Sequence, residues 1–123
     1  MTHIKMISFS SDSSGCAGRI AERLNDVLIE QYRMNEDPSL TASTLSRLVQ
    51  QAMVDCDLIV FFSDIDTVER AIAPYIANSG YDPAVLCLDA SENTVIELIT
   101  SAKKEVQKTG VQIADLFRTS LIV

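Results

Sequence analysis

Residues 10–18 hold the densest group of side chains that could do chemistry, with four hydroxyls, two glycines and one cysteine. Hydroxyls beside the free amides of a helix N-terminus suit an anion or a phosphate, because they add donors to the positive end of the helix dipole. Asp12 would repel such a ligand. The same residues also suit a helix cap, with Ser13 or Ser14 as the expected N-cap, and both interpretations stay open. The candidate ligand-binding residues of this segment are Ser10, Ser11, Ser13, Ser14 and Gly15.

A second candidate group follows the apolar run at residues 58–62. Asp64 and Asp66 could hold a divalent cation or act as acid and base, although acidic residues equally favour the first turn of a helix. Arg70 presents a guanidinium fork that suits a carboxylate, or it pairs with Asp66 or Glu69 on its own helix. Asp64, Asp66 and Arg70 are therefore further candidate ligand-binding residues.

The cysteines and the single histidine form no metal-binding pattern. Cys16, Cys56 and Cys87 lie far apart without a C-x-x-C pair, and His3 stands near the start of the chain. A zinc site or a disulfide framework needs paired spacing. We expect no metal and no cofactor, and Cys16 lacks a nearby histidine in the sequence that could act as its base.

Composition excludes several classes of protein. Lys and Arg number 10 against 17 Asp and Glu, which gives a net charge of −7 over 123 residues, unlike a protein that binds nucleic acid. No apolar run approaches the roughly 20 residues of a membrane-spanning helix, and the N-terminus lacks the features of a signal peptide. We therefore expect a cytoplasmic protein that forms one domain over residues 1–123, with neither nucleic acid nor membrane as partner.

Apolar runs and helical periodicities alternate along the chain. Strands are predicted at residues 4–9, 58–62 and 84–88, and the last two are continuous apolar runs typical of strands buried on both faces. Apolar residues recur at helical spacing in four segments, which lie at residues 17–28, 45–53, 68–76 and 95–106.

Boundaries are predicted at turn residues. Breaks are expected at residues 35–39 and 78–80, Gly110 is expected to end the last helix, and Pro74 must kink its helix or begin a short turn. Residues 29–34 fit either an extension of the preceding helix or an edge strand, and residues 111–123 fit either a strand or a helix.

This order predicts an α/β fold, a three-layer α/β/α sandwich around a mostly parallel sheet of four or five strands. Residues 58–62 and 84–88 should form adjacent central strands. Ligands bind beyond the carboxyl ends of such strands, where residues 10–18, 63–67 and 89–93 should meet. His3 should lie on the opposite rim.

Residues 57–99 resemble the N-terminal domain of the CbiG family of anaerobic cobalamin biosynthesis. The likeness is carried by R-A-I-A-P at residues 70–74, D-P-A-V at 82–85, Leu88-Asp89 and V-I-E-L-I at 95–99. The resemblance implies a relative of hydrolases that open the lactone of a cobalt-precorrin and release a two-carbon aldehyde. Where the family has S-G-H followed by Gly-Gly-Ala-Asn, this chain has Thr100-Ser101-Ala102 and then residues 103–106, which should continue as ordinary helix.

The lost histidine motif suggests a stand-alone relative that serves as a binding or accessory module and lacks hydrolase activity by itself. A corrinoid or tetrapyrrole is the expected ligand, and a partner protein would supply the missing C-terminal domain. The alternative is a flavodoxin-like protein that binds a phosphate or nucleotide, since residues 10–18 resemble the phosphate loop of flavodoxins without a Walker-type lysine.

Overall fold

The computed structural model describes residues 1–34, 42–75 and 83–122. In this part of the chain, strands and helices alternate, except that two successive strands form a hairpin before the last helix. The strands are β1 (Thr2–Ser8), β2 (Val27–Arg33), β3 (Leu58–Phe62), β4 (Ala84–Asp89) and β5 (Thr94–Ile99). The helices are α1 (Ser11–Glu22), α2 (Ala42–Asp55), α3 (Ile65–Ile72) and α4 (Lys104–Ile122), with a short 3₁₀ turn at Ala73–Tyr75.

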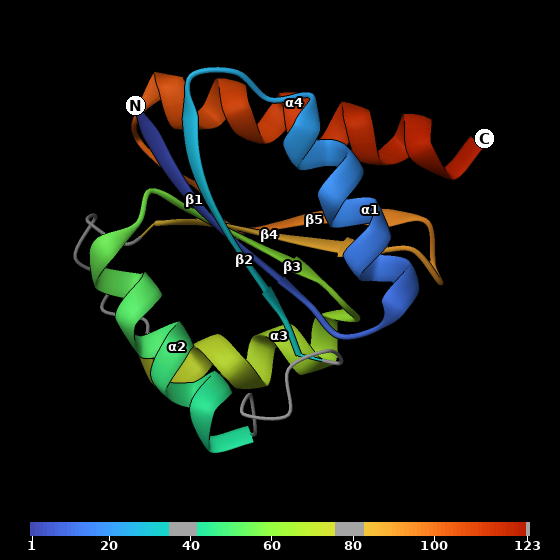
Figure 1. Cartoon of the computed structure of the whole chain (residues 1–123). Coiled ribbons are helices and arrows are strands. Elements are labelled where there is room, and N and C mark those ends of the chain that lie inside the picture. The colour runs from blue at the N-terminus through green and yellow to red at the C-terminus, as the bar shows by residue number, and fades with distance from the viewer. Residues whose placement is uncertain (35–41, 76–82, 123) are drawn as a thin grey trace.

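The five strands form one sheet in the order β2-β1-β3-β4-β5. All neighbours are parallel except β4 and β5, which are antiparallel. Helices α1 and α4 cover one face of the sheet, and α2 and α3 cover the other (Figure 1). The predicted three-layer fold is therefore confirmed, with β3 at the centre of the sheet beside β4.

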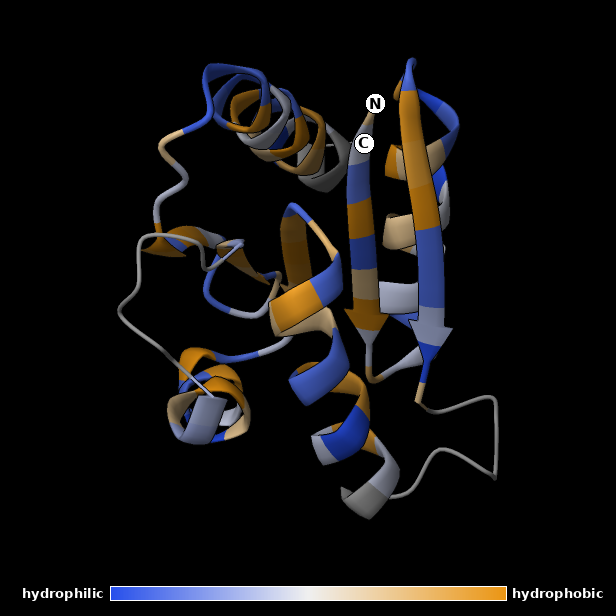
Figure 2. Ribbon diagram, turned by 90° about the vertical axis from the view of Figure 1, so that its left-hand side faces the viewer, coloured by the Kyte–Doolittle hydropathy of each residue, from blue (hydrophilic) through white to orange (hydrophobic). Residues whose placement is uncertain are grey.

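A hydrophobic core lies on each side of the sheet. Along β3, Leu58, Val60 and Phe62 pack toward α1 and α4, and Ile59 and Phe61 pack toward α2 and α3. Every residue of β3 and β4 is buried, which explains their continuous apolar sequences. The helices alternate orange and blue along their length, as helices with one apolar face do (Figure 2).

The helix predicted over residues 95–106 is wrong. Residues 94–99 form β5, and residues 100–103 connect it to α4 without regular structure. Asn93 adopts a left-handed φ of 52° and closes a tight turn after Asp89, so the chain returns as a hairpin rather than crossing over as a helix. Gly110 does not end a helix either, because it lies inside α4, which answers the open question about residues 111–122.

The start and end of α1 also differ from the prediction. Ser10, rather than Ser13 or Ser14, is the N-cap, and its side chain accepts a hydrogen bond from the Ser13 amide. Val27 and Leu28 were expected on the helix but begin β2, because Asp26 with a φ of 58° turns the chain after α1. The edge-strand alternative for residues 29–34 is confirmed.

Pro74 lies in the 3₁₀ turn Ala73–Tyr75 that follows α3 and does not kink the helix, which ends at Ile72. Tyr75 lies in that turn, while Ile76 and the breaks expected at residues 35–39 and 78–80 fall outside the described residues. In the described part of the chain, no helix is both long enough and apolar enough to cross a membrane.

Candidate functional site

The carboxyl ends of β1, β3 and β4 meet at one edge of the sheet. The chain leaves β1 toward β2 on one side and later returns to β3 on the other, so the strand order reverses between β1 and β3. Open α/β sheets bind ligands at such a switch point. A cavity of about 680 Å³ lies there, within the roughly 300–1,000 Å³ of small-molecule sites.

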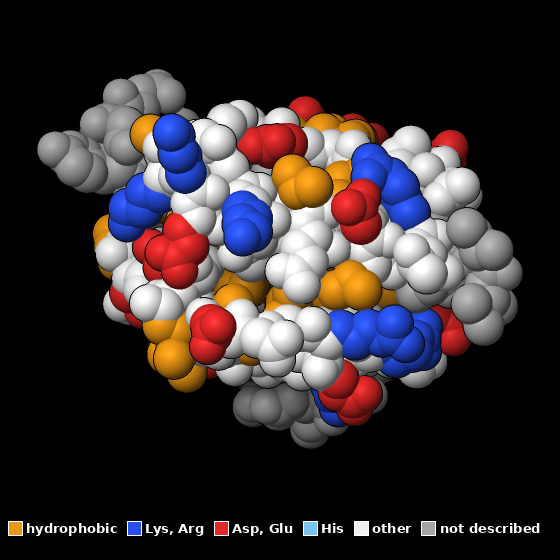
Figure 3. Space-filling view, turned by 90° about the horizontal axis from the view of Figure 1, so that it is seen from above, with side chains coloured by type: hydrophobic (Ala, Val, Ile, Leu, Met, Phe, Trp, Pro, Cys, Tyr) orange, Lys and Arg blue, Asp and Glu red, His pale blue; other side chains and the backbone are white. Residues whose placement is uncertain are grey.

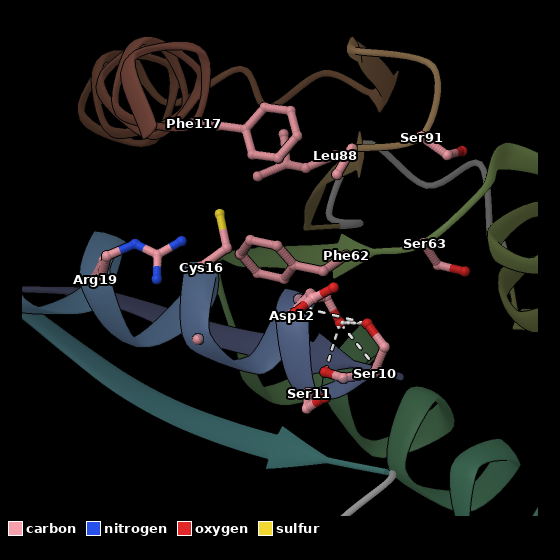
Figure 4. Close-up of a pocket in the computed structure, with 13 residues that line it drawn as sticks. Ser10, Ser11, Asp12, Cys16, Arg19, Phe62, Ser63, Leu88, Ser91 and Phe117 are labelled. Carbon is pink, nitrogen blue, oxygen red and sulfur yellow. Dashed lines mark hydrogen bonds between the residues drawn. The ribbon is translucent and has the colours of Figure 1, made fainter. Parts of the chain in front are cut away.

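The cavity has an apolar floor and a polar rim. The floor comes from Cys16 of α1, Phe62 at the end of β3, Leu88 of β4 and Phe117 of α4, all buried. In Figure 4 the rings of Phe62 and Phe117 approach from opposite sides, with Cys16 beside Phe62. The rim consists of Ser10, Ser11, Asp12, Ser13, Gly15, Arg19, Ser63, Ala90 and Ser91.

Four of the five candidates in the first segment line the cavity, but two of their hydroxyls already form the helix cap. Ser10 Oγ accepts from the Ser13 amide at 3.1 Å, and Ser13 Oγ accepts from the Ser10 amide at 3.0 Å while donating to the Ser10 carbonyl. Ser14 is buried with its Oγ 2.9 Å from Ser8 Oγ and does not line the cavity. The capping interpretation therefore describes Ser10 and Ser13, while Ser11 and Gly15 remain on the rim.

The cavity also contains two charged residues that the sequence did not single out as ligand-binding. Asp12 and Arg19 are exposed, line the rim and form no ion pair with any described residue. Arg19 extends toward Cys16 in Figure 4. The signal was present in the spacing, because Asp12, Gly15, Cys16 and Arg19 follow one another at positions i, i+3, i+4 and i+7 and so share one face of α1.

The second candidate group does not line this cavity. Asp64 is the N-cap of α3, where its carboxylate accepts from the Thr67 amide, the Thr67 hydroxyl and the Ser63 hydroxyl. The hydrogen bonds from Thr67 lower the pKa of Asp64, which keeps the carboxylate ionised. Asp66 is exposed in the first turn of α3, and Arg70 lines a separate cavity of about 290 Å³ between α2 and α3.

In the part of the chain that the structure describes, Arg70 forms no ion pair, so the pairing with Asp66 or Glu69 is not observed. The structure therefore brings the first and third predicted loops together around the cavity. From the second loop it adds Ser63 but neither Asp64 nor Asp66.

The third loop is held by Asp89 at the end of β4. One carboxylate oxygen accepts from the Ser91 amide at 3.0 Å, the Ser91 hydroxyl at 2.7 Å and the Glu92 amide at 3.4 Å. These bonds fix the turn into β5 and place Ser91 on the rim of the cavity (Figure 4). Asp89 thus stabilises the turn that follows it.

The family model for the N-terminal domain of cobalamin synthesis protein G matches residues 47–123, more than half of the chain. The chain belongs to this family. The resemblance predicted from residues 70–74 and 82–85 is confirmed, and it ties the chain to cobalamin biosynthesis.

A solved structure agrees with the family. The crystal structure of a cobalamin biosynthesis protein G homologue from Sulfolobus solfataricus superposes with a TM-score of 0.69 at 22% sequence identity. The match covers 93% of this chain and 34% of that chain, so the domain spans about a third of that chain's length. At this identity the likeness shows the fold. No curated protein sequence matches the chain.

The segment that departs most from the family pattern lies at the opposite edge of the sheet. Residues 100–102 follow β5, whose last residue pairs with Val85 near the start of β4. Ser101 Oγ accepts from the Lys103 amide at 3.1 Å, and Lys103 Nζ lies 3.2 Å from Asp57 Oδ1. This segment was expected to continue as helix and is instead a connection at the amino ends of the parallel strands, far from the cavity floor.

His3 also lies at this amino edge, as expected from its place at the start of β1. Its Nε2 is 2.6 Å from Glu30 Oε1, and its Nδ1 is 3.2 Å from the Asp55 carbonyl. Hydrogen bonds from Tyr32 and His3 lower the pKa of Glu30. The buried Lys5 ammonium lies 3.0 Å from Asp55 Oδ1. This group joins β1, β2 and α2 and has no part in the cavity.

The cysteines are all free. Burial raises the pKa of Cys56 to about 12 and that of Cys87 to about 11, so both thiols stay protonated near neutral pH. Cys87 donates to the Ser63 carbonyl at 3.1 Å. No group of three or more metal-binding side chains occurs among the residues that the structure describes.

Proposed function

We propose that this domain is a corrinoid-binding module of cobalamin biosynthesis that does not open the cobalt-precorrin lactone by itself. The observation that carries the proposal is the cavity at the strand-order reversal, with two phenylalanine rings and Leu88 as its floor and polar groups as its rim. A tetrapyrrole combines an apolar ring system with polar substituents around its edge. The apolar floor and polar rim of the cavity match that distribution.

The surroundings of Asp64, Asp89 and His3 argue against their serving as the base for hydrolysis by this chain alone. Opening a lactone with water needs a positioned general base, which typically contributes about 10²–10⁴ in rate. Asp64 has a lowered pKa and is occupied by Thr67, while Asp89 accepts the three hydrogen bonds that build its own turn. His3 lies at the other edge of the sheet, hydrogen-bonded to Glu30.

A partner protein would then complete the reaction. The domain covers 34% of the Sulfolobus solfataricus homologue, and the family's S-G-H is replaced by Thr100, Ser101 and Ala102. In this proposal, the domain holds the corrinoid and a partner supplies the catalytic groups.

Two neighbouring phenylalanines provide the test of binding. Phe62 lines the cavity, whereas Phe61 precedes it on β3 and is buried on the other face of the sheet. Phe62→Leu and Phe61→Leu should each destabilise the domain by about 1 kcal/mol, since both exchange one large apolar side chain for another. Only Phe62→Leu should weaken binding of a corrinoid in a fluorescence or absorbance titration. Equal affinity of the two variants would place the ligand elsewhere, and no binding to the wild type would end the proposal.

The test of catalysis uses the cobalt-precorrin lactone as substrate. The purified domain alone should release no two-carbon aldehyde above the rate without protein. Aldehyde release that is abolished by Asp64→Asn, in a variant that still folds, would instead make the domain a hydrolase.

A further inference from the structure

We infer that Arg19 binds a carboxylate of the ligand, so that the module prefers corrinoids with free side-chain carboxylates to those in which these groups are amides. The inference deepens the proposed function and depends on it. It assigns a specificity-determining role to a residue outside the motifs that suggested the family.

The first support is the position of Arg19 on α1. Asp12, Gly15, Cys16 and Arg19 share one face of the helix, and all four line the cavity. Cys16 belongs to the apolar floor, so a ring resting on that floor would lie beside the side chain of Arg19 (Figure 4). A substituent at the edge of the ring would therefore meet the guanidinium.

The second support is that the guanidinium is available. Arg19 makes no hydrogen bond or ion pair with any residue that the structure describes. Its Nη1 would lie 3.4 Å from a Cβ placed on Gly15, so the side chain folds back over this glycine. Because Gly15 has no side chain, the space on the cavity side of the guanidinium stays open.

The third support is the distribution of charge along the cavity. The Asp12 carboxylate stands about two turns nearer the start of α1 than Arg19. An anionic group is therefore repelled from the helix N-terminus and attracted at Arg19. The Ser10 and Ser13 hydroxyls cannot compensate, since they are engaged in the helix cap.

Among the described residues that line the cavity, Arg19 is the one Lys or Arg. Figure 3 looks down on the face covered by α1 and α4 and shows hydrophobic side chains in a furrow across it, with charged residues of both signs on either side. A carboxylate fits the planar fork of a guanidinium with two parallel hydrogen bonds, and a carboxamide accepts them only at its oxygen and without charge. The preference for carboxylate over amide follows from this difference.

Three exposed residues make the experiment specific. Arg19→Gln removes the charge from the cavity, and Arg23→Gln removes the same charge from the exposed C-cap of α1, outside the cavity. Asp12→Asn removes the opposing charge. All three changes lie on the surface, where the free energy of unfolding should change by no more than about 0.5 to 1 kcal/mol.

The probes are cobyrinic acid, a corrinoid with free side-chain carboxylates, and its amidated counterpart. The wild type should bind the acid more tightly. Arg19→Gln should weaken binding of the acid by about fivefold to tenfold and leave the amide nearly unchanged, while Arg23→Gln should change neither. Asp12→Asn should strengthen binding of the acid.

The outcomes separate the two claims. If Phe62→Leu weakens binding but Arg19→Gln and Arg23→Gln behave alike, the role of Arg19 is wrong and the proposed site stands. The same holds if the wild type binds acid and amide equally. If the wild type binds neither probe, the proposed function fails and the role of Arg19 fails with it.

Discussion

Two glycines on α1 provide a matched test of the cavity wall. Gly15 lines the cavity and Gly18 does not, although both lie inside the same helix. A Cβ at Gly15 would meet Arg19 Nη1 at 3.4 Å, and a Cβ at Gly18 would meet Arg33 Nη2 at 3.7 Å, so neither alanine creates a clash. Each substitution should stabilise the domain by about 0.5–1 kcal/mol, because alanine loses less backbone entropy in a helix than glycine.

The two variants should differ in ligand binding. Gly15→Ala places a methyl group beside the Arg19 guanidinium and inside the cavity, whereas the methyl group of Gly18→Ala lies outside it. In thermal denaturation, both midpoints should rise by about 2–6 °C for a domain of this size. In a corrinoid titration, only Gly15→Ala should lose affinity. A Gly15→Ala variant that is stabilised and binds as tightly as the wild type would refute the assignment of this helix face to the site.

Three further predictions concern side chains outside the cavity. The lowered pKa of Glu30 means that its contribution to stability is complete above the usual carboxyl pKa of about 4.5 and is lost as the pH falls through the lower folded value. In urea denaturation between pH 7 and pH 3, the free energy of unfolding should therefore fall less steeply for Glu30→Gln than for the wild type. Lys5→Met should leave the free energy of unfolding within about 1 kcal/mol of the wild type, whereas Asp55→Asn should lower it by about 2 kcal/mol. The reason is that Asp55→Asn leaves the Lys5 ammonium, whose side chain is only 5% exposed, without its counter-charge. Equal losses for the two variants would contradict this. Asp64→Ala should cost about 1 kcal/mol and Asp64→Asn much less, as asparagine also caps a helix, and a large loss for both would point to a role beyond the cap of α3.

The central strands could be predicted from the sequence because their environment leaves one interpretation. Residues 58–62 and 84–88 are short, continuous and apolar, which fits strands covered on both faces, and the structure places them side by side. The edge strand β5 was harder to predict from the sequence. Val95, Leu98 and Ile99 have helical spacing, yet they lie on β5, whose two faces both pack partly against helices. The decisive local signal was the turn before the strand, where Asn93 accepts a left-handed conformation.

The candidate site was predicted in part for a similar reason. The serines of residues 10–18 were recognised by residue type, and the topology brings them to the cavity as expected. Their hydroxyls, however, are used by the helix cap, which residue type alone could not reveal. Phe62, Leu88 and Phe117 form the floor but look like ordinary core residues in the sequence, because only the packing of α4 against α1 and the strand ends leaves them beside a cavity.

The most direct test of the central claim is to map corrinoid binding by amide chemical shifts in the isotopically labelled domain. The two edges of the sheet are distinguishable, since the cavity lies at the carboxyl ends of the strands and the segment that replaces the family's histidine motif lies at the amino ends. Binding in the cavity predicts shifts at residues 10–19, 62–63, 88–91 and 117 on titration with cobyrinic acid. Shifts confined to residues 3, 57 and 100–103, or no shifts at all, would contradict it.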